Sequence, residues 1–278
     1  MRLLPIRLFL ALGFALTAVS VHAQVKASLI AADASIQPGH IFTVALRLQP
    51  DPHWHTYWEF PGTGLPTSLT WELPPGFAAG AIQWPVPNVL RDADQKVIGY
   101  GYESEVCLLV PITPPPTLTA GTSVTLKARA DWLMCKDVCQ PGGADVQLTL
   151  PVSSGAPTPD TANAGLFAAT RAKLPQALPT SWSATASKHD GVIELRLNLT
   201  AAVRPSPTSL YFFSEDGLID YEQPQTIRMT KEGYLLRLKT APTDTPPTRL
   251  RGVLRSETGW GDASAEPAGF TIEVPLTS

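Results

Sequence analysis

The chain has 278 residues, with 28 prolines, 20 glycines and three cysteines, and its formal net charge is −3. A slightly acidic chain lacks the basic surface that nucleic-acid binding needs, so we expect no nucleic-acid partner. Three cysteines are too few for a disulfide-built scaffold, so the fold must be stabilised mainly by buried apolar surface.

The first 23 residues have the pattern of a secretory signal peptide. Arg2 and Arg7 precede an apolar run, and small residues at Val21 and Ala23 are spaced like a signal-peptidase site. The run is shorter than the ~20 apolar residues that a membrane-spanning helix needs, and no later segment comes close. We therefore expect cleavage after Ala23, export, and no membrane span in the mature chain.

Residues 24–152 are predicted to form an antiparallel β-sandwich. Short apolar or alternating segments recur there, each bounded by Gly, Pro or Asp, as in a sandwich built from many short strands. These segments are KASLIAA, IFTVALRLQP, TSLTWEL, VCLLVPI, TSVTLKARADWL and ADVQLTLPV.

Residues 153–180 are predicted to be a linker, because Ser, Ala, Pro and Thr dominate them. One piece near 164–173 is helix-capable, with Asp160 and Thr161 available to cap it. A second series of short strands follows in residues 181–278, which predicts a second immunoglobulin-like sandwich of about a hundred residues. This part has no cysteine, so we expect it to orient or dock the first domain rather than to carry chemistry.

The segment HWHTYWEFPGTGLP, residues 53–66, concentrates aromatic and histidine side chains. Alternation along a strand would place His53, His55 and Tyr57 on one face and the intervening residues on the other. Two histidines on one face could hold Zn or Cu, and an ordinary amphipathic strand at a sandwich edge explains the same pattern.

The pair Cys135 and Cys139, in DWLMCKDVCQPGG, could be a redox pair, a passive bridge or part of a metal site. On one straight strand the two Cα atoms would be ~13 Å apart, beyond the ~7 Å limit for a disulfide. A hairpin loop or one helical turn would bring the sulfurs together, and the following Pro-Gly-Gly favours a loop. Since a bridge over so short a loop stabilises a fold least, the spacing favours a pair that opens and closes.

Two further hypotheses concern the sulfur atoms. Cys107, in SEVCLLVPI, is predicted to be a small buried hydrophobic residue, with a third redox or copper-binding sulfur as the alternative. A copper-handling protein would use Met134, Cys135, Cys139 and His55, because thioether and thiolate ligands suit Cu(I). A structural, partner-binding sandwich with one disulfide is the remaining alternative.

The same motifs resemble a known family. HWHTYWEFPGTGLPTSLTWELPPGF, IQWPVPN, IGYGYESEVCLLVPI and WLMCKDVCQPGGADVQLTLP are similar, in that order, to the N-terminal periplasmic domain of the DsbD and ScsB group of thiol:disulfide interchange proteins. In the second half, SLYFFSEDGLIDYEQPQ and LRGVLRSETGW resemble the extra β domain of the ScsB-like branch.

The resemblance implies a periplasmic, immunoglobulin-like redox module. Its partners would be thioredoxin-like periplasmic proteins and a membrane electron carrier on another chain. The second cysteine of the pair, Cys139, would form the mixed disulfide with partners, and Cys135 would resolve it. The redox-active disulfide would be the only redox group, with no added cofactor or metal.

The resemblance also implies a cap over the cysteine pair. The corresponding loop is Val97–Tyr102, where Ile98, Tyr100 and Tyr102 would shield the sulfurs, and aromatic side chains at His55 and Tyr57 would line the site. The better-known DsbD domain spaces its cysteines more widely. This chain carries neither a membrane-spanning domain nor a thioredoxin domain, so we expect the electron pathway to need other chains.

Overall fold

The computed structural model describes residues 24–199, 210–243, 247–260 and 268–277. The predicted signal peptide lies outside these residues. Within them, strands dominate and a single α-helix is present, so the expected all-β, immunoglobulin-like fold is confirmed.

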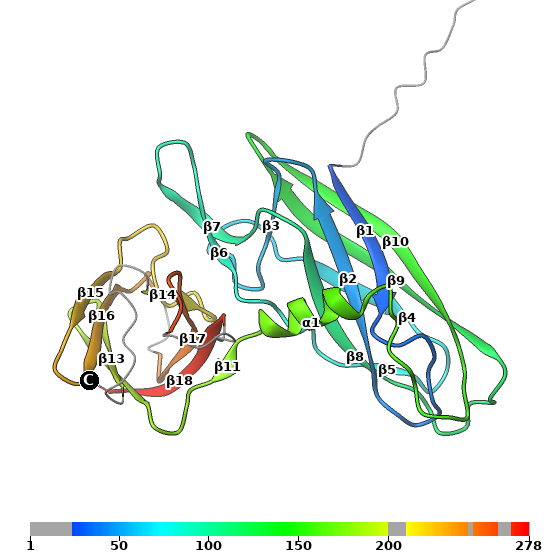
Figure 1. Ribbon diagram of the computed structural model, residues 1–278. Helices are drawn as coiled ribbons and strands as arrows, with labels where there is room; N and C mark the ends of the chain where they lie inside the picture. The colour runs from blue at the N-terminus through cyan, green and yellow to red at the C-terminus, as the bar shows by residue number, and fades with distance from the viewer. Residues whose placement is uncertain (1–23, 200–209, 244–246, 261–267, 278) are drawn as a thin grey trace, which may run out of the picture.

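Residues 24–152, which we call the N-terminal unit, form two facing antiparallel sheets (Figure 1). The first has the order β1-β2-β8-β5; the second has the order β10-β9-β3-β7-β6, with β4 also paired to β9. The strands are β1 (Val25–Ala31), β2 (Phe42–Pro50), β3 (His55–Tyr57), β4 (Ser68–Glu72), β5 (Ala78–Ala79), β6 (Asn88–Arg91), β7 (Val97–Tyr102), β8 (Val106–Thr113), β9 (Ser123–Cys135) and β10 (Cys139–Pro151).

The alternating sequence of β9 explains how the second sheet packs. Its even-numbered residues from Leu126 to Met134 are buried, while Lys127, Arg129 and Asp131 are exposed on the outer face. The alternation ends at Cys135, which is buried although it belongs to the outer face. Other side chains must therefore cover the outer face at this end of the strand.

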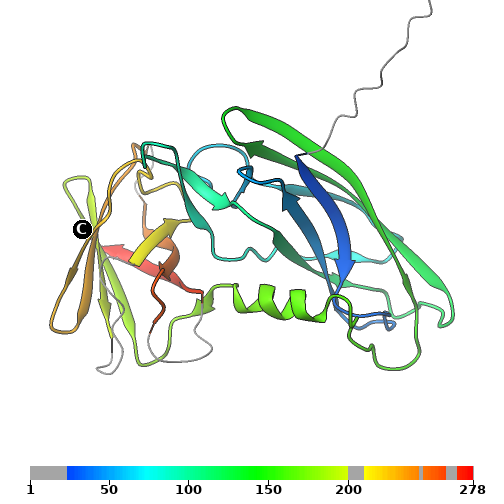
Figure 2. The same ribbon diagram turned by 45° about the horizontal axis from the view of Figure 1, so that its top comes forward.

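The single helix, α1 (Ala164–Ala172), lies within the segment expected to be a linker. Its N-cap is Asn163, with no side-chain cap, although Asp160 binds the backbone nearby. Phe167 is 1% exposed and packs in a cluster with Cys107 of β8. The helix thus rests on the first sheet and runs toward the C-terminal strands (Figure 2).

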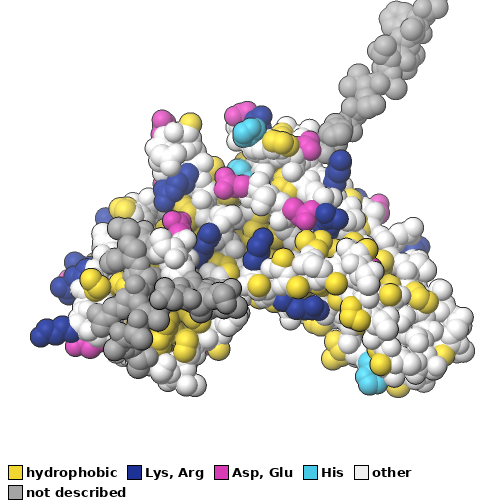
Figure 3. All heavy atoms as spheres, viewed as in Figure 1, with side chains coloured by type: hydrophobic (Ala, Val, Ile, Leu, Met, Phe, Trp, Pro, Cys, Tyr) yellow, Lys and Arg dark blue, Asp and Glu magenta, His cyan; other side chains and the backbone are white. Residues whose placement is uncertain are grey.

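The remaining strands, which we call the C-terminal unit, form one eight-stranded sheet with its own core. Its order is β14-β17-β18-β12-β13-β16-β15, with β11 paired to β18. The strands are β11 (Gln176–Ala177), β12 (Ser183–His189), β13 (Val192–Asn198), β14 (Leu210–Ser214), β15 (Thr226–Met229), β16 (Gly233–Lys239), β17 (Arg249–Ser256) and β18 (Gly269–Thr277). Charges of both signs are interspersed on the visible face of both units (Figure 3).

An aromatic junction joins the two units. Phe213 of β14 and Val253 of β17 belong to the hydrophobic core of the N-terminal unit. The Phe213 ring lies 4.9 Å from that of Tyr100, centroid to centroid, and the Tyr100 and Tyr211 hydroxyls are 3.1 Å apart. Because these side chains are shared, the C-terminal unit is packed against β7 and is not merely tethered to it.

Candidate redox site

The two cysteines face each other across the β9–β10 hairpin. Cys135 ends β9, Cys139 begins β10, and the two are paired in register around the three-residue loop 136–138. Their Cα atoms are 4.1 Å apart and their sulfurs form a disulfide. The hairpin arrangement that the sequence allowed is therefore the one adopted.

The two sulfur-bearing residues differ sharply in exposure. Cys135 is only 3% exposed, whereas Cys139 lies in the exposed class, beside Val138, which is 66% exposed. Exchange needs a thiolate to reach a sulfur along the S–S axis, so access decides which sulfur reacts first. An incoming protein therefore meets Cys139 and an exposed apolar side chain next to it.

Two polar side chains of β3 reach the disulfide from the neighbouring strand. The Tyr57 hydroxyl donates a hydrogen bond to Cys135 Sγ at 3.2 Å and lies 3.7 Å from Cys139 Sγ. His55 Nε2 lies 3.4 Å from the same hydroxyl oxygen. A hydroxyl has one hydrogen, so when Tyr57 donates to sulfur, the remaining role of its oxygen is to accept from His55 Nε2–H.

Burial keeps both of these groups uncharged. Desolvation lowers the pKa of His55, which disfavours the imidazolium. Desolvation, and secondarily the charge on an ionised Tyr221, raises the pKa of Tyr57. Near neutral pH the phenol thus retains the proton that it donates toward sulfur.

Two glycines border the Tyr57 ring, and a third pairs with its backbone. A Cβ at Gly64 would lie 2.7 Å from Tyr57 Cζ, and one at Gly99 would lie 3.5 Å from Tyr57 Cε1. Gly101 is the direct β7 partner of Tyr57. Leu90 belongs to the same buried cluster as Tyr57 and Cys135. Glycines and one leucine therefore set the position of this ring.

The residues proposed from sequence fall into two groups. His55, Tyr57, Cys135 and Cys139 contact one another, and Ile98 packs against the cluster that contains Cys135. Alternation along β3 also places Thr56 on the opposite, inner face of the sheet.

Tyr100 and Tyr102 belong to the other group, in the inner core of the N-terminal unit. Tyr100 contacts the C-terminal unit, and the Tyr102 hydroxyl donates to the Pro85 carbonyl at 2.6 Å. The predicted face shared by His53 and His55 is wrong, because β3 begins at His55, and His53 precedes it with a φ of 71°. Gly64, which borders the Tyr57 ring, was not predicted as a site residue, although the PGTG motif that follows the aromatic strand is a signal for a tight turn.

The four-residue copper set is not brought together. Met134 is buried in the inner core, on the face of β9 opposite to Cys135. Across the described ranges, no three His, Cys, Asp or Glu side chains are grouped so that they could hold a metal ion. In the same ranges, the structure contains no helix with the length and apolar character of a membrane span.

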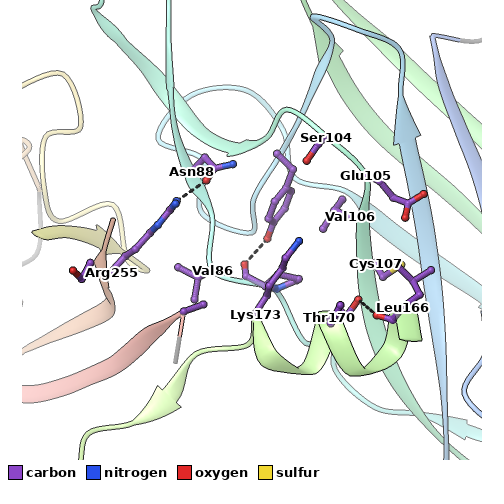
Figure 4. Close-up of a pocket in the computed structure, with 15 residues that line it drawn as sticks. Val86, Asn88, Ser104, Glu105, Val106, Cys107, Leu166, Thr170, Lys173 and Arg255 are labelled. Atoms are coloured by element: carbon purple, nitrogen blue, oxygen red, sulfur yellow. Dashed lines mark hydrogen bonds between the residues drawn. The ribbon is translucent and has the colours of Figure 1, made fainter. Parts of the chain in front are cut away.

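Cys107 is a free thiol, as expected, and it is 3% exposed. Burial is the main cause that raises its pKa to about 11. It lines a pocket of about 300 Å³ between α1, the first sheet and the C-terminal unit (Figure 4). Across this pocket Arg255 donates to the Pro87 carbonyl and to Asn88 Oδ1, which adds a polar link to the junction.

The fold and the site define a class: an immunoglobulin-like sandwich that carries a partly exposed, short-loop disulfide on a hairpin end. Residues 23–151 match the family model described as "Thiol:disulfide interchange protein DsbD, N-terminal". The N-terminal unit is thus a member of the family of DsbD N-terminal domains. Among curated proteins, none matches the sequence.

One solved structure extends the likeness in fold to both units. The N-terminal periplasmic domain of ScsB from Proteus mirabilis is 15% identical with a TM-score of 0.60, and the match covers 90% of each chain. BcpA, the major pilin subunit of Bacillus cereus, is 8% identical (TM-score 0.27; 91% of this chain, 69% of that one). Spo0M from Bacillus subtilis is 10% identical (TM-score 0.24; 91% and 90%).

Proposed function

We propose that the protein is an exported, periplasmic thiol:disulfide exchange module that passes reducing equivalents to or from thioredoxin-like proteins through Cys135 and Cys139. The observation that carries this proposal is the pairing of the exposed residue Cys139 with the buried Cys135, whose sulfur accepts a hydrogen bond from Tyr57. A membrane electron carrier on another chain would supply or receive the electrons.

The geometry suggests the order of bond changes when the pair is reduced. A partner thiolate attacks Cys139 Sγ, the Cys135–Cys139 bond breaks, and Cys135 leaves as a thiolate. The Tyr57 hydroxyl, already 3.2 Å from that sulfur, stabilises the new negative charge. The partner's second thiolate then attacks the sulfur of the partner's first cysteine in the mixed disulfide, and Cys139 leaves as a thiolate. The partner has then lost two electrons and the Cys135–Cys139 pair has gained two.

The reverse direction uses the same atoms. The Cys139 thiolate attacks a partner disulfide, and the Cys135 thiolate resolves the mixed disulfide by attacking Cys139 Sγ. Tyr57 and His55 would position the buried thiol and its proton. The disulfide itself stores the two electrons, so the proposal needs no further cofactor.

Trapping with single-cysteine variants tests this function. Cys135→Ser should accumulate a mixed disulfide through Cys139 when mixed with an oxidised thioredoxin-like protein, because the resolving thiol is absent. Cys139→Ser should trap little, since Cys135 is buried. The double variant, in which Cys107 alone remains, is the control and should form no adduct.

The adducts are read by non-reducing electrophoresis and peptide mass mapping. Adduct from Cys139→Ser but not from Cys135→Ser would reverse the two roles. An absence of adduct from either variant, with correctly folded protein, would refute the exchange function.

A further inference from the structure

Two tyrosines from different units contact the same turn. A Cβ at Gly62 would lie 2.7 Å from the Tyr221 ring atoms Cγ and Cδ1, and a Cβ at Gly64 would lie 2.7 Å from Tyr57 Cζ. Both glycines have positive φ, 74° and 86°. The segment Gly62–Gly64, which we call the glycine turn, is therefore in direct contact with Tyr57 of the redox site and with Tyr221 of the C-terminal unit.

The turn is anchored at its base as well. The Tyr100 backbone N–H donates to the Pro61 carbonyl at 3.0 Å. The Tyr100 ring in turn packs against Tyr221, with 6.4 Å between ring centroids, and against Phe213. The ring of Tyr221 is thus held between the turn and the aromatic junction.

Polar contacts fix the outer end of Tyr221. Its hydroxyl donates to Glu222 Oε1 at 3.2 Å and also interacts with the Thr63 side chain in the turn. Glu222 pairs with Lys96 of the N-terminal unit at 3.3 Å. A continuous series of contacts therefore runs from the C-terminal unit through the glycine turn to the Tyr57 hydroxyl and the disulfide.

We infer that Tyr221 is a positioning residue for the redox pair: it presses the glycine turn onto the Tyr57 ring and so fixes the hydrogen bond from Tyr57 to the Cys135 sulfur. This inference rests on the proposed function, and it gives the C-terminal unit, which has no thiol of its own, a part in the exchange chemistry. A donor to a thiolate stabilises the reduced, ionised pair. Loss of Tyr221 weakens that donor and shifts the equilibrium toward the disulfide.

The equilibrium between reduced and oxidised protein in dithiothreitol buffers measures this effect. The whole chain is used, from about pH 6 to about pH 9, and thiols are counted after acid quenching and alkylation. Tyr57→Phe should shift the ratio about tenfold toward the disulfide, since a hydrogen bond to a charged group is lost. Tyr221→Ala should shift it in the same direction by roughly threefold, because the donor is loosened rather than removed.

Two variants separate positioning from general loosening of the junction. Tyr221→Phe keeps the ring against Gly62 and should restore the wild-type ratio. Tyr211→Ala removes another tyrosine of the junction, one that contacts Tyr100 but not the glycine turn, and should leave the ratio unchanged. The shift caused by Tyr221→Ala should also grow with pH as thiolate forms, which a purely structural defect would not produce.

The double variant Tyr57→Phe with Tyr221→Ala decides the matter. If Tyr221 acts through Tyr57, the double variant equals Tyr57→Phe alone. Additive shifts, or a wild-type ratio in Tyr221→Ala, would overturn the inference. The measurement needs no protein partner. The inference about Tyr221 can therefore be refuted while the trapping experiment supports the exchange function, and the exchange function can be refuted while the Tyr221 effect is observed.

Discussion

The redox site and the aromatic junction are built on opposite faces of the same two strands, β3 and β7. On the outer face, Tyr57 and Leu90 pack in a small cluster with the buried Cys135, and its disulfide partner Cys139 is exposed. On the inner face, Tyr100 packs among aromatic rings from both units. The comparison teaches that the densely packed face fixes the backbone, which leaves the other face free to carry sparse and reactive groups.

Two cysteines of the N-terminal unit can also be compared directly. Cys139 is exposed beside the glycine-rich beginning of β10, whereas Cys107 is buried beneath α1 near the junction. A cysteine is thus exposed in one setting, and in the other it is buried with a raised pKa.

Thiol labelling should give the largest contrast between the regions. In the reduced native protein at about pH 8, Cys139 should react with iodoacetamide at least ~10³-fold faster than Cys107, because the buried thiol is almost entirely protonated. Its pKa is raised to about 11 by burial. Peptide mass mapping over time gives the rates, and the denatured protein, in which all three thiols should label, is the control. Equal rates in the native protein would mean that α1 and the first sheet do not shield Cys107.

The second prediction concerns the strength of the junction. Phe213→Ala removes a ring that is 0% exposed and in contact with Trp58 and Tyr100, so it should lower the free energy of unfolding by about 3–5 kcal/mol. Urea unfolding followed by tryptophan fluorescence measures the loss. Met229→Ala, at a residue that is 56% exposed, is the control and should change stability by less than about 0.5 kcal/mol. A loss as small as the control would show that the two units are packed independently.

The sequence predicted the hairpin that carries the two cysteines better than it predicted which side chains from other strands contact the sulfurs. Strand alternation and the Cys135–Cys139 spacing are local properties, so the β9–β10 hairpin and the buried Cys107 followed from composition and order. The meeting of His55 and Tyr57 with the sulfurs depends on which strands pair. That pairing was inferred from a resemblance and not from the residues.

The local sequence pattern could not predict on which face of β7 the Tyr100 side chain lies. It is two residues from Ile98, and regular alternation would place both on one face. Gly99 has a φ of 133°, and the β6–β7 pairing skips Ile98, because Leu90 pairs with Gly99 and Arg91 with Val97; both features interrupt that regularity. Ile98 therefore packs with the sulfur cluster while Tyr100 faces Phe213, more than a hundred residues away in sequence. Long-range packing of this kind has no signal in a single sequence.

The third prediction isolates the contact between the glycine turn and Tyr57. Gly64→Ala places a methyl group 2.7 Å from the Tyr57 ring at a φ of 86°, so it should cost about 1–3 kcal/mol and slow exchange at the disulfide. Gly121→Ala is the matched control, because Gly121 has a φ of 83° and no atom within 4 Å of the added methyl group. The difference between the two variants, in urea unfolding and in the rate of reduction by dithiothreitol, measures the steric term alone. If the two variants have the same stability and the same reduction rate, the Tyr57 ring can move away from the added methyl group and the turn does not fix its position.

The smallest expected effect is a pH dependence of the junction. Burial, and secondarily the charge on Glu59 across the junction, raises the pKa of Glu215 in the folded protein. A carboxyl with a raised folded-state pKa binds more protons when folded, so its contribution to stability falls as the pH rises above the unfolded value of about 4.3. Glu215→Gln should therefore stabilise the protein near pH 7, by less than ~1 kcal/mol because the side chain is only half-buried, and the gain should disappear near pH 4.

The partner and the control of this acid pair are also in the structure. In a Glu59→Gln background the gain from Glu215→Gln should shrink, because one source of repulsion is already gone. Glu222→Gln should give no gain, since Glu222 pairs with Lys96 at 3.3 Å and loses that partner when neutral. Urea unfolding at about pH 4, 5.5 and 7 measures all four proteins against wild type. If Glu215→Gln destabilised the protein at pH 7, attraction to Arg251 within the C-terminal unit would outweigh burial and the repulsion from Glu59, and the predicted gain in stability would be wrong.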